Sequence, residues 1–255
     1  MLPLRNSENS EFDPTENAIQ VIGEQDGSFD SGDFILFYGE TQQFNEDSNT
    51  HINLYDDNAY YYITADGQNG LRINPYNEPS GVATTTITQF NDYQFHEIDD
   101  ANPALVGRRW FGNRFDINNQ QTFEFSFPNI ISGQPMQFKI FAIAASEIIT
   151  SMTVSVNGQL QIFPNFAASS NINLASGRNF VGEINASSET VTVDLNYNNG
   201  GNPSSIAYLD YISINALRQL SGTEGQLSFK YDAAATLSGI GEYQINNATQ
   251  FSEVC

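Results

Sequence analysis

Apolar and polar residues alternate at every second position in segment after segment of this chain, whereas helical periodicity hardly occurs. Phe123-Glu-Phe-Ser-Phe127 alternates strictly, and Met152-Thr-Val-Ser-Val156 does so again. Successive side chains of a β-strand point to opposite faces of the sheet, so this pattern is typical of strands that bury one face. The chain is therefore predicted to be all-β, with Phe123, Phe125 and Phe127 facing the core.

Further strand-like segments follow one another through the second half of the chain. Asn157-Gly158 is the strongest hairpin signal, because both central residues of a type I′ turn need a positive φ. Asn198 to Pro203 is a run of turn formers that predicts a loop between two strands. About eight short strands of this kind indicate a two-sheet, jelly-roll-like β-sandwich. The other predicted strands are 136–144, 160–163, 180–184, 191–195, 207–214, 227–231 and 241–245.

The first hundred residues predict a smaller antiparallel β-unit, over residues 17–98. Phe34 to Tyr38 is a continuous apolar run between glycines, typical of a strand buried on both faces. Tyr60 to Thr64 leads to Asp66-Gly67, a hairpin-type turn before the next extended stretch at 71–73. Thr84 to Phe90 alternates threonine with larger apolar residues, as a half-exposed strand would.

Charge divides the chain and limits its partners. The net charge is −21, from 30 acidic and 9 basic residues. Residues 1–100 hold 19 of the acids and 2 of the bases, so we predict an acidic N-terminal β-unit at 1–100 and a β-sandwich at 101–255. Such an excess of acids disfavours nucleic acids and anionic membranes as partners. No apolar run reaches the length of a transmembrane helix.

A basic and aromatic cluster lies at this predicted boundary. Arg108-Arg-Trp-Phe-Gly-Asn-Arg114 holds three of the nine basic residues together with the only tryptophan. Its position favours a structural seam between the two units over a free ligand patch. We expect Trp110 to be largely buried, and Arg108, Arg109 and Arg114 to pair with acids of the N-terminal unit.

Residues with catalytic chemistry are sparse. Cys255 is the only cysteine, so it excludes an intrachain disulfide, and its surroundings match no nucleophile motif. His51 and His96 are isolated, and we expect each at a strand edge or at the rim of the sandwich. The sequence contains no Gly-x-Ser-x-Gly elbow, no His-Glu-x-x-His and no phosphate loop. No residue is therefore predicted to be catalytic.

One acidic loop could hold a metal ion. Asp26, Asp30 and Asp33 alternate with glycine and serine, and such a loop can direct carboxylate oxygens to one hard cation. The sequence thus offers a calcium site there. The alternative is a solvated turn whose aspartates cap backbone amides. Asp56 and Asp57 form a second, weaker acidic pair.

Several segments, taken in order, resemble a known family. Gly23 to Gly39 reads GEQDGSFDSGDFILFYG and resembles the "GEEDGxFDxxDYILFYG" segment of gingipain-like cysteine peptidases, especially the PorU-type sortases of the type IX secretion system. Residues 53–62 and 92–99 are similar to the segments that follow there, 108–112 to a "GRxWFG" element, and 202–212 to a later strand. The ordered likeness covers roughly residues 20–250.

The resemblance implies a non-catalytic N-terminal β-region of a longer exported protein at the surface of a Bacteroidota-type bacterium. In the family, a downstream caspase-like domain carries the catalytic cysteine and histidine and cleaves the sorting signals of secreted cargo. No position here matches those motifs, so no catalytic role is carried over. The implied partners are the downstream peptidase domain, cargo C-terminal domains and secretion subunits. The abrupt end at Cys255 is expected to mark a cut before that domain.

Two functions of other classes stay open. A jelly roll with exposed aromatic residues could be a carbohydrate-binding module, although alternation leaves only one face of Tyr60, Tyr61 and Tyr62 available, and core or rim packing is the expected role. A calcium-stabilised adhesion domain is the other alternative. Glycan binding and a calcium-dependent melting temperature would distinguish them.

Overall fold

The protein is described from a computed structural model that covers residues 15–39, 50–52, 58, 60–65, 67–74, 77–103, 109–169, 175–222 and 226–251. Within these ranges the regular structure is β-strand, apart from short 3-10 turns at Glu24–Asp26, Asp232–Thr236 and Ala248–Gln250. None of the helical turns found there approaches the length or apolarity of a membrane-crossing helix. The chain divides into two compact units, Met1–Pro79 and Ser80–Cys255.

The first unit is built on one two-stranded ribbon. β1 (Ile19–Ile22) pairs antiparallel with β2 (Phe34–Phe37), and Ile19 also bridges to Arg72. The Arg72 guanidinium lies 2.9 Å from the Glu24 carboxylate. β1 and β2 thus form an antiparallel pair within the region where the sequence predicts a smaller β-unit.

The burial predicted for the apolar run in β2 is wrong. Phe34 is 48% exposed and Phe37 is 42% exposed, although the strand itself forms where it was expected. A lone ribbon has no second sheet to cover its faces, so an apolar run in it need not be buried. Leu71 and Ile73 are likewise exposed, and in the described part of 60–65 and 71–73 only an isolated bridge at Arg72 forms.

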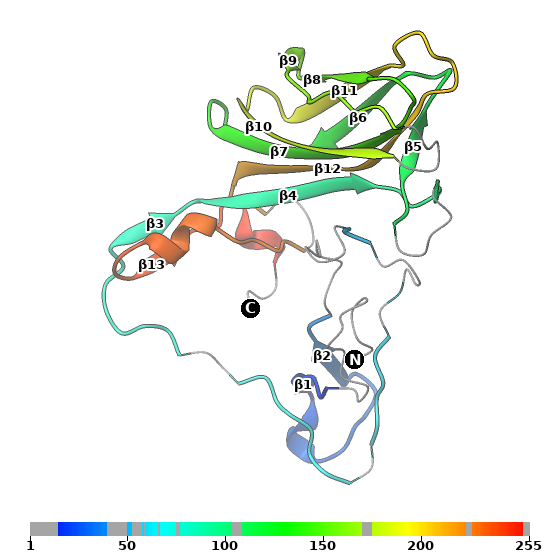
Figure 1. Ribbon diagram of the computed structural model, residues 1–255. Helices are drawn as coiled ribbons and strands as arrows, with labels where there is room; N and C mark the ends of the chain where they lie inside the picture. Colours follow the sequence, from blue (N-terminus) through cyan, green and yellow to red (C-terminus); the bar gives the residue numbers. More distant parts are fainter. Residues whose placement is uncertain are drawn as a thin grey trace. The chain divides into compact units, whose positions relative to one another are not determined.

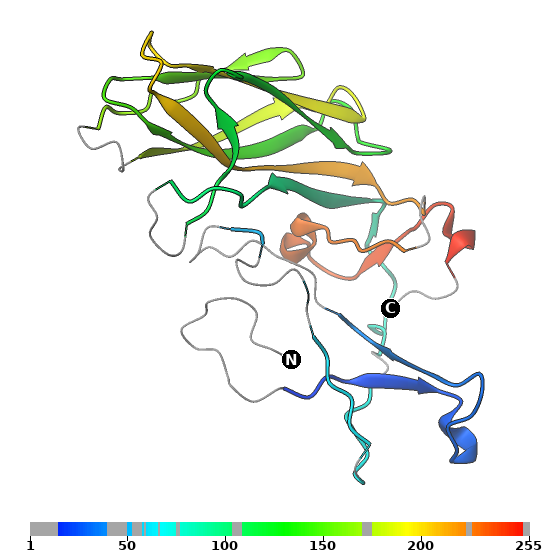
Figure 2. The ribbon, with the colours of Figure 1, turned by 90° about the vertical axis from the view of Figure 1, so that its right-hand side faces the viewer.

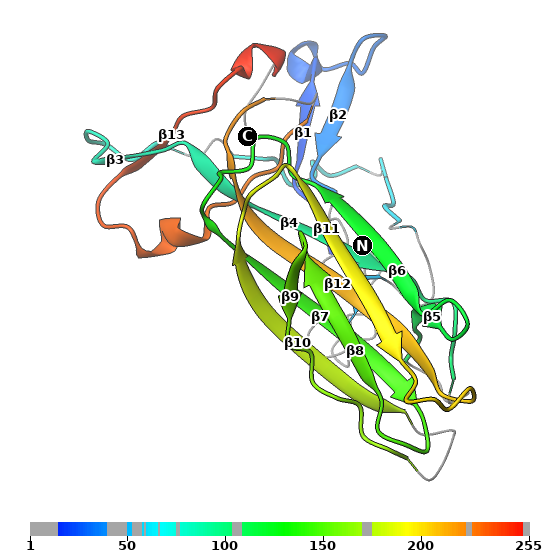
Figure 3. The same cartoon turned by 90° about the horizontal axis from the view of Figure 1, so that it is seen from above.

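The second unit is a sandwich of two antiparallel sheets (Figure 1). One sheet has the order β10 (Ser176–Asn185), β7 (Pro135–Ala145), β12 (Ile206–Gln219) and β4 (Gln89–Glu97), with β5 (Gly112–Phe115) also paired to β12. The other has the order β6 (Gln120–Ser126), β11 (Thr190–Asn198), β8 (Ser151–Val156) and β9 (Gln159–Gln161). Figure 3 shows the second sheet lying over the first. The all-β, jelly-roll-like sandwich predicted from alternation is confirmed.

The core lies between these sheets and follows the alternation in the sequence. Phe123, Phe125 and Phe127 are all buried, as predicted. Facing them from the other sheet are the buried side chains of Phe138, Ile140, Leu209, Ile212 and Ile214. Burial of these apolar faces at about 25 cal/mol per Å² drives the two sheets together.

Two predicted turns are also confirmed. Asn157 and Gly158 have φ of 49° and 76°, and they join β8 to β9 as a two-residue hairpin. The loop of turn formers at 198–203 connects β11 to β12, with positive φ at Gly200 and Gly201. Both turns use residues that tolerate the left-handed region, which is why their sequence signals were specific.

The division between units falls earlier than the predicted residue 100. β4 was assigned to the N-terminal unit, but it pairs with β12 along the whole register from Tyr211–Glu97 to Gln219–Gln89 (Figure 2). A short parallel pair of β3 (Thr85–Ile87) and β13 (Gly241–Tyr243) continues beside it. The expected strand at 227–231 is instead an isolated bridge between Lys230 and Asn91.

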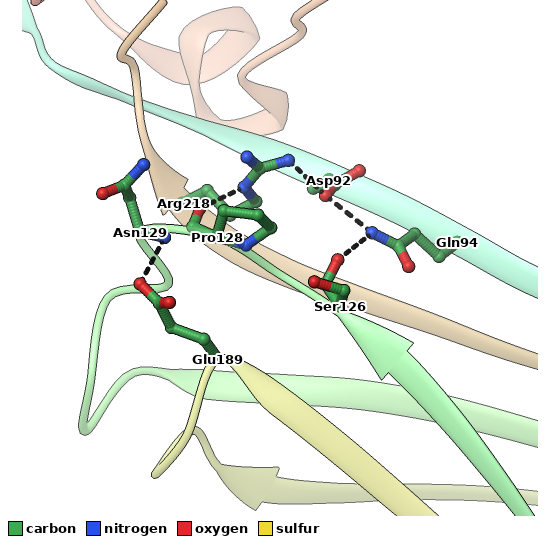
Figure 4. A network of polar contacts seen from close by, with 7 residues as sticks. All are labelled: Asp92, Gln94, Ser126, Pro128, Asn129, Glu189 and Arg218. Carbon is green, nitrogen blue, oxygen red and sulfur yellow. Dashed lines mark hydrogen bonds and ion pairs between the residues drawn. The ribbon is translucent and has the colours of Figure 1, made fainter. Parts of the chain in front are cut away.

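A polar network closes the edge of the sandwich where β4 faces β6 (Figure 4). Arg218 is only 8% exposed, donates through Nε to Pro128 O at 2.6 Å, and pairs through Nη1 with Asp92 Oδ2 at 2.8 Å. Gln94 Nε2 donates to Asp92 Oδ2 at 3.1 Å and to Ser126 O at 2.6 Å. These bonds satisfy polar groups that would otherwise be costly to bury.

Candidate functional site

Three carboxylates from different parts of the second unit meet at the end of β4. Glu97 ends that strand, Asp99 follows it, and Asp210 lies within β12. One carboxylate oxygen of each lies within 4.8 Å of the others. We call these three residues the carboxylate cluster. Among the described residues it is the one group of three or more acidic, histidine or cysteine side chains that the structure brings this close together.

Asp210 reaches this position through a β-bulge. In the pairing of β12 with β7, Leu209 lies opposite Ala142 and Tyr211 lies opposite Phe141, so Asp210 is the extra residue. A bulge breaks the strict alternation of side chains and can redirect one of them. The Asp210 side chain is 4% exposed, which makes it a buried acid flanked by the apolar residues of β12.

A second irregularity faces the bulge from β5. The register of β5 with β12 shifts between Arg114, opposite Tyr208, and Gly112, opposite Leu209, which leaves Asn113 as the extra residue with φ of 29°. Asn113 Oδ1 lies 2.7 Å from His96 Nε2. Two adjacent bulges thus shape the sheet around the carboxylate cluster.

The segment that follows Asp99 is paired closely with the segment that precedes β5. Phe111 N–H donates to Ala101 O, and Ala101 N–H donates to Phe111 O, each at 2.8 Å. Next to this pair, a Cβ at Gly112 would lie 2.5 Å from Ile98 O and 2.6 Å from Ile98 Cβ. Only glycine allows the two segments to approach this closely.

Arg109 faces the cluster from the same paired segment. Its Nη2 lies 3.3 Å from Asp210 Oδ2, and its side chain is 51% exposed. The guanidinium also lies 4.9 Å from the ring centroid of Phe141 and 5.6 Å from that of Phe111. Arginine commonly combines an ion pair with stacking on aromatic faces in this way.

Burial and mutual repulsion favour the protonated acids. Burial is the largest of the causes that raise the pKa of Asp210 to about 8; the charges of Glu97 and Asp99 also raise it, and Arg109 lowers it. Burial, with the charges of Glu97 and Asp100, raises the pKa of Asp99 to about 6. One oxygen of Asp99, Oδ2, is buried without a hydrogen-bond partner among the described residues.

Two tyrosines beside the cluster are affected in the same direction. Burial raises the pKa of Tyr211, with the charge of Asp210 as the next cause, and Tyr211 is fully buried. Burial also raises the pKa of Tyr93. Both phenols thus stay neutral well above pH 7.

The structure places part of the basic and aromatic cluster here. Arg108 lies outside the described residues. Trp110 is 37% exposed, so the expectation that it is largely buried is wrong. Arg109 pairs with Asp210 and Arg114 pairs with Asp116 at 2.9 Å, and both acids lie beyond residue 100 rather than in the N-terminal unit as predicted. The last residues of the segment, from Gly112 on, belong to strand β5, which pairs with β12.

The acidic loop of the first unit shows turn-type hydrogen bonds. Asp26 Oδ1 accepts the N–H of Ser28 at 2.9 Å, and Asp33 Oδ2 accepts the N–H of Asp30 at 2.6 Å. Asp26, Asp30 and Asp33 are all described, but they do not form a cluster of oxygens comparable to that around Asp210. Their role as calcium ligands stays a prediction.

The remaining candidates separate into three groups. His96 lies on β4 at the edge of its sheet, as predicted, and its ring packs 4.8 Å from that of Phe123. His51 is fully buried rather than at an edge or rim. Tyr60 and Tyr62 are exposed, whereas the ring of Tyr61 packs against Phe37 at 4.9 Å. The other candidates, Asp56, Asp57 and Cys255, lie outside the described residues.

Sequence reasoning missed the carboxylate cluster, although one local signal exists. Asp210 interrupts Tyr208-Leu-Asp-Tyr-Ile212, an apolar run at the centre of a long predicted strand. An acid in such a run is rarely buried without a special arrangement, so it marks a bulge or a functional group. Nothing local could have shown that Glu97 and Asp99 lie beside it.

A polar hollow of about 320 Å³ lies on the other sheet. Four asparagines, Thr153 and Tyr197 line it, and the asparagines are Asn119, Asn196, Asn198 and Asn199. The amides of Asn198 and Asn199 accept backbone N–H groups of the following glycines at 2.9 Å. These side chains therefore hold the loop in shape, and a carbohydrate-binding role for the chain stays a prediction.

The comparisons with known proteins concern mainly the fold. No protein-family model matches this sequence, and neither does any curated protein. Among solved structures, the dimeric latent PorU from Porphyromonas gingivalis is similar over 91% of this chain, with 17% sequence identity and a TM-score of 0.67. The match covers 22% of that PorU chain, and it shows that the two share a fold.

Carbohydrate-binding modules show only partial likeness. The CBM36-1 domain of a multidomain xylanase from the hindgut metagenome of Trinervitermes trinervoides matches 48% of this chain and 96% of its own, with 14% identity and a TM-score of 0.30. A CBM36 module in complex with calcium and xylotriose matches 50% of this chain and 99% of its own, with 11% identity and a TM-score of 0.29. Likeness at this level carries no argument about ligands.

Proposed function

We propose that this chain is a non-catalytic β-region of a PorU-like sortase, a gingipain-like cysteine endopeptidase that processes type IX secretion cargo. The observation that carries the proposal is the extent of the fold match, which includes both units and 91% of the chain. The ordered segments at 23–39, 92–99, 108–112 and 202–212 point independently in the same direction. Fold alone does not determine function, so the sequence likeness matters to the argument.

In this proposal the chain supports a peptidase domain of the same protein and docks cargo. A region that corresponds to 22% of the PorU chain leaves ample length for a catalytic domain elsewhere in the parent protein. The parent would be an exported protein of a Bacteroidota-type bacterium, acting at the cell surface. Cargo C-terminal domains and secretion subunits are the proposed partners.

The decisive experiment is to sequence the reading frame that contains this chain and then to assay cargo processing by the parent protein. We expect a caspase-like domain with a catalytic histidine and cysteine downstream. A parent protein lacking residues 15–251 should lose cargo processing while its catalytic domain is still exported. A reading frame that ends directly after Cys255 would contradict the proposal.

Docking needs its own test. Immobilised chain is exposed to purified cargo C-terminal domains, and to the same cargo without that domain as control. Retention of the first and not the second is expected. If the full-length parent retains cargo and this chain does not, the docking role is wrong while the supporting role stands.

A further inference from the structure

The carboxylate cluster combines close spacing, burial and an unsatisfied oxygen. Three carboxylate oxygens lie within 4.8 Å of one another, and Asp210 is 96% removed from solvent, since its side chain is 4% exposed. Glu97 and Asp99 are half-buried, so three negative charges at this spacing repel one another more strongly than they would in bulk water. A proton held between two of the carboxyl groups converts one repulsion into a short O–H···O⁻ hydrogen bond.

We propose that Asp99 and Asp210 share a proton at neutral pH, beside the carboxylate of Glu97. This proton stabilises the backbone pairing of Ala101 with Phe111, so that raising the pH loosens the segment that presents Arg109 and Trp110. The buried Oδ2 of Asp99 is the atom that would gain a hydrogen bond from this proton, because it has no hydrogen-bond partner among the described residues. A proton on a neighbouring carboxyl, or on Oδ2 itself, supplies the missing bond.

The pairing of Ala101 with Phe111 is close in sequence to two of the charged groups. Asp99 is two residues before Ala101, and Arg109 is two residues before Phe111. Two backbone hydrogen bonds of 2.8 Å join the pair, and Asp100 N–H adds a third to Phe111 O at 3.1 Å. If Asp99 turns outward to escape repulsion, these bonds are the first to weaken.

Every neighbouring element contributes to the charge balance. β4 supplies Glu97 and Tyr93, the paired segment supplies Asp99, Asp100 and Arg109, and β12 supplies Asp210 and Tyr211. From β7, the Lys139 ammonium lies 5.6 Å from the ring centroid of Tyr211. From β5, Arg114 is engaged by Asp116. The raised pKa of Asp210, about 8, already includes the opposing effect of Arg109.

The linkage fixes the direction of the effect. Both aspartates have a folded-state pKa above the ordinary value of 3.8. Such groups contribute stability that is present at low pH and is lost as the pH rises through the folded-state values. The loss therefore extends from about pH 4 to about pH 8, and it levels off above that value.

Hydrogen exchange of the full chain tests the proposal. We expect the protection factor of the Phe111 amide, corrected for intrinsic exchange, to fall about tenfold or more between about pH 5.5 and about pH 8.5. The amide of Val193, in the centre of the other sheet, serves as the internal control. Asp210→Asn should keep Phe111 protected at both values, because an amide cannot ionise.

Asp99→Asn provides a second variant in case the first does not fold. Its amide can donate to a neighbouring carboxylate as the shared proton does, so we expect a smaller fall in protection than in the native chain. An equal fall in the native chain and in both variants would overturn the proposal. Loss of protection at pH 5.5 on adding a chelator would also overturn it, because a bound cation would then be holding the carboxylates together.

Discussion

Arg109 and Asp210 form an ion pair whose partners differ sharply in exposure, since the arginine side chain is 51% exposed and the aspartate side chain 4%. The exposed partner can be rehydrated at little cost when the pair separates, but the buried acid cannot. The acid, and not the arginine, therefore decides how this pair responds to pH. The pair also joins the paired segment at 109–111 to the bulge of β12.

Replacing Arg109 with methionine should destabilise the chain in a pH-dependent way. At about pH 8.5 we expect a loss of roughly 1 to 3 kcal/mol in the free energy of unfolding, because an ionised, buried Asp210 loses its cation. At about pH 5.5 Asp210 is neutral and the loss should be well under 1 kcal/mol. Denaturant unfolding at the two pH values measures the difference.

Arg109→Lys is the matched control for that substitution. It keeps the positive charge but loses the planar contact with Phe141. We expect an intermediate loss at about pH 8.5. Equal losses for Arg109→Met at both pH values would mean that the arginine acts by packing alone.

Asp210→Asn should flatten the pH dependence of stability. In the native chain a single raised pKa of about 8 makes the free energy of unfolding fall by at most about 1.4 kcal/mol per pH unit between about pH 6 and pH 8. Exposed carboxylates are already ionised in that interval, so they add little slope. The readout is the difference between variant and native curves, and parallel curves would contradict the assignment to Asp210.

Arg218 should be one of the most sensitive polar positions of the sandwich. Arg218→Ala leaves Asp92 and Pro128 O without their partner at a nearly closed edge. Removing one side of a buried ion pair costs about 3 to 5 kcal/mol. Lys230→Ala is the control, because the Lys230–Asp232 pair is 84% and 49% exposed and should be worth less than about 1 kcal/mol. Comparable losses for the two variants would show that the edge network is not special.

The strands of the sandwich could be predicted because their signal is local. Alternation at Phe123 to Phe127 and the Asn157-Gly158 pair each depend on neighbouring residues only, and both were confirmed. Exposure could not be predicted in the same way. Phe34 to Phe37 reads as a buried strand, yet a two-stranded ribbon has nothing that must cover it.

The site could not be predicted because it depends on pairing between distant segments. The charge distribution predicted that Trp110 and the neighbouring arginines form a contact between the two units. Instead, β5 pairs with β12, and Arg109 lies beside Asp210. Asp210 becomes a neighbour of Glu97 through the register of β12 with β4, in which Tyr211 lies opposite Glu97. A one-residue bulge determines whether Asp210 lies beside Glu97, and the periodicity of the sequence carries no information about that bulge.

Calcium provides a test of the acidic loop in the first unit. One oxygen each of Asp26 and Asp33 already accepts a backbone N–H, whereas calcium takes about 6 to 8 oxygen ligands. A ligand that binds only the native state must raise the melting temperature. Because these oxygens are already engaged, we expect no such binding, and excess calcium should leave the melting temperature unchanged within about 1 °C. A rise that disappears in Asp30→Asn would instead establish the predicted calcium site.

Gly112→Ala should weaken the pairing beside the carboxylate cluster. The new methyl group would lie 2.5 Å from Ile98 O, so the segments around Ile98 and Gly112 must separate. Overpacking of this kind costs about 1 to 3 kcal/mol. Gly39→Ala is the control, because a Cβ there would meet Tyr61 at 3.6 Å, an ordinary contact. Denaturant unfolding should show the loss for Gly112→Ala only, and hydrogen exchange should show faster exchange at Phe111. An unchanged exchange rate at Phe111 would mean that the close approach of Ile98 does not control the pairing of Ala101 with Phe111.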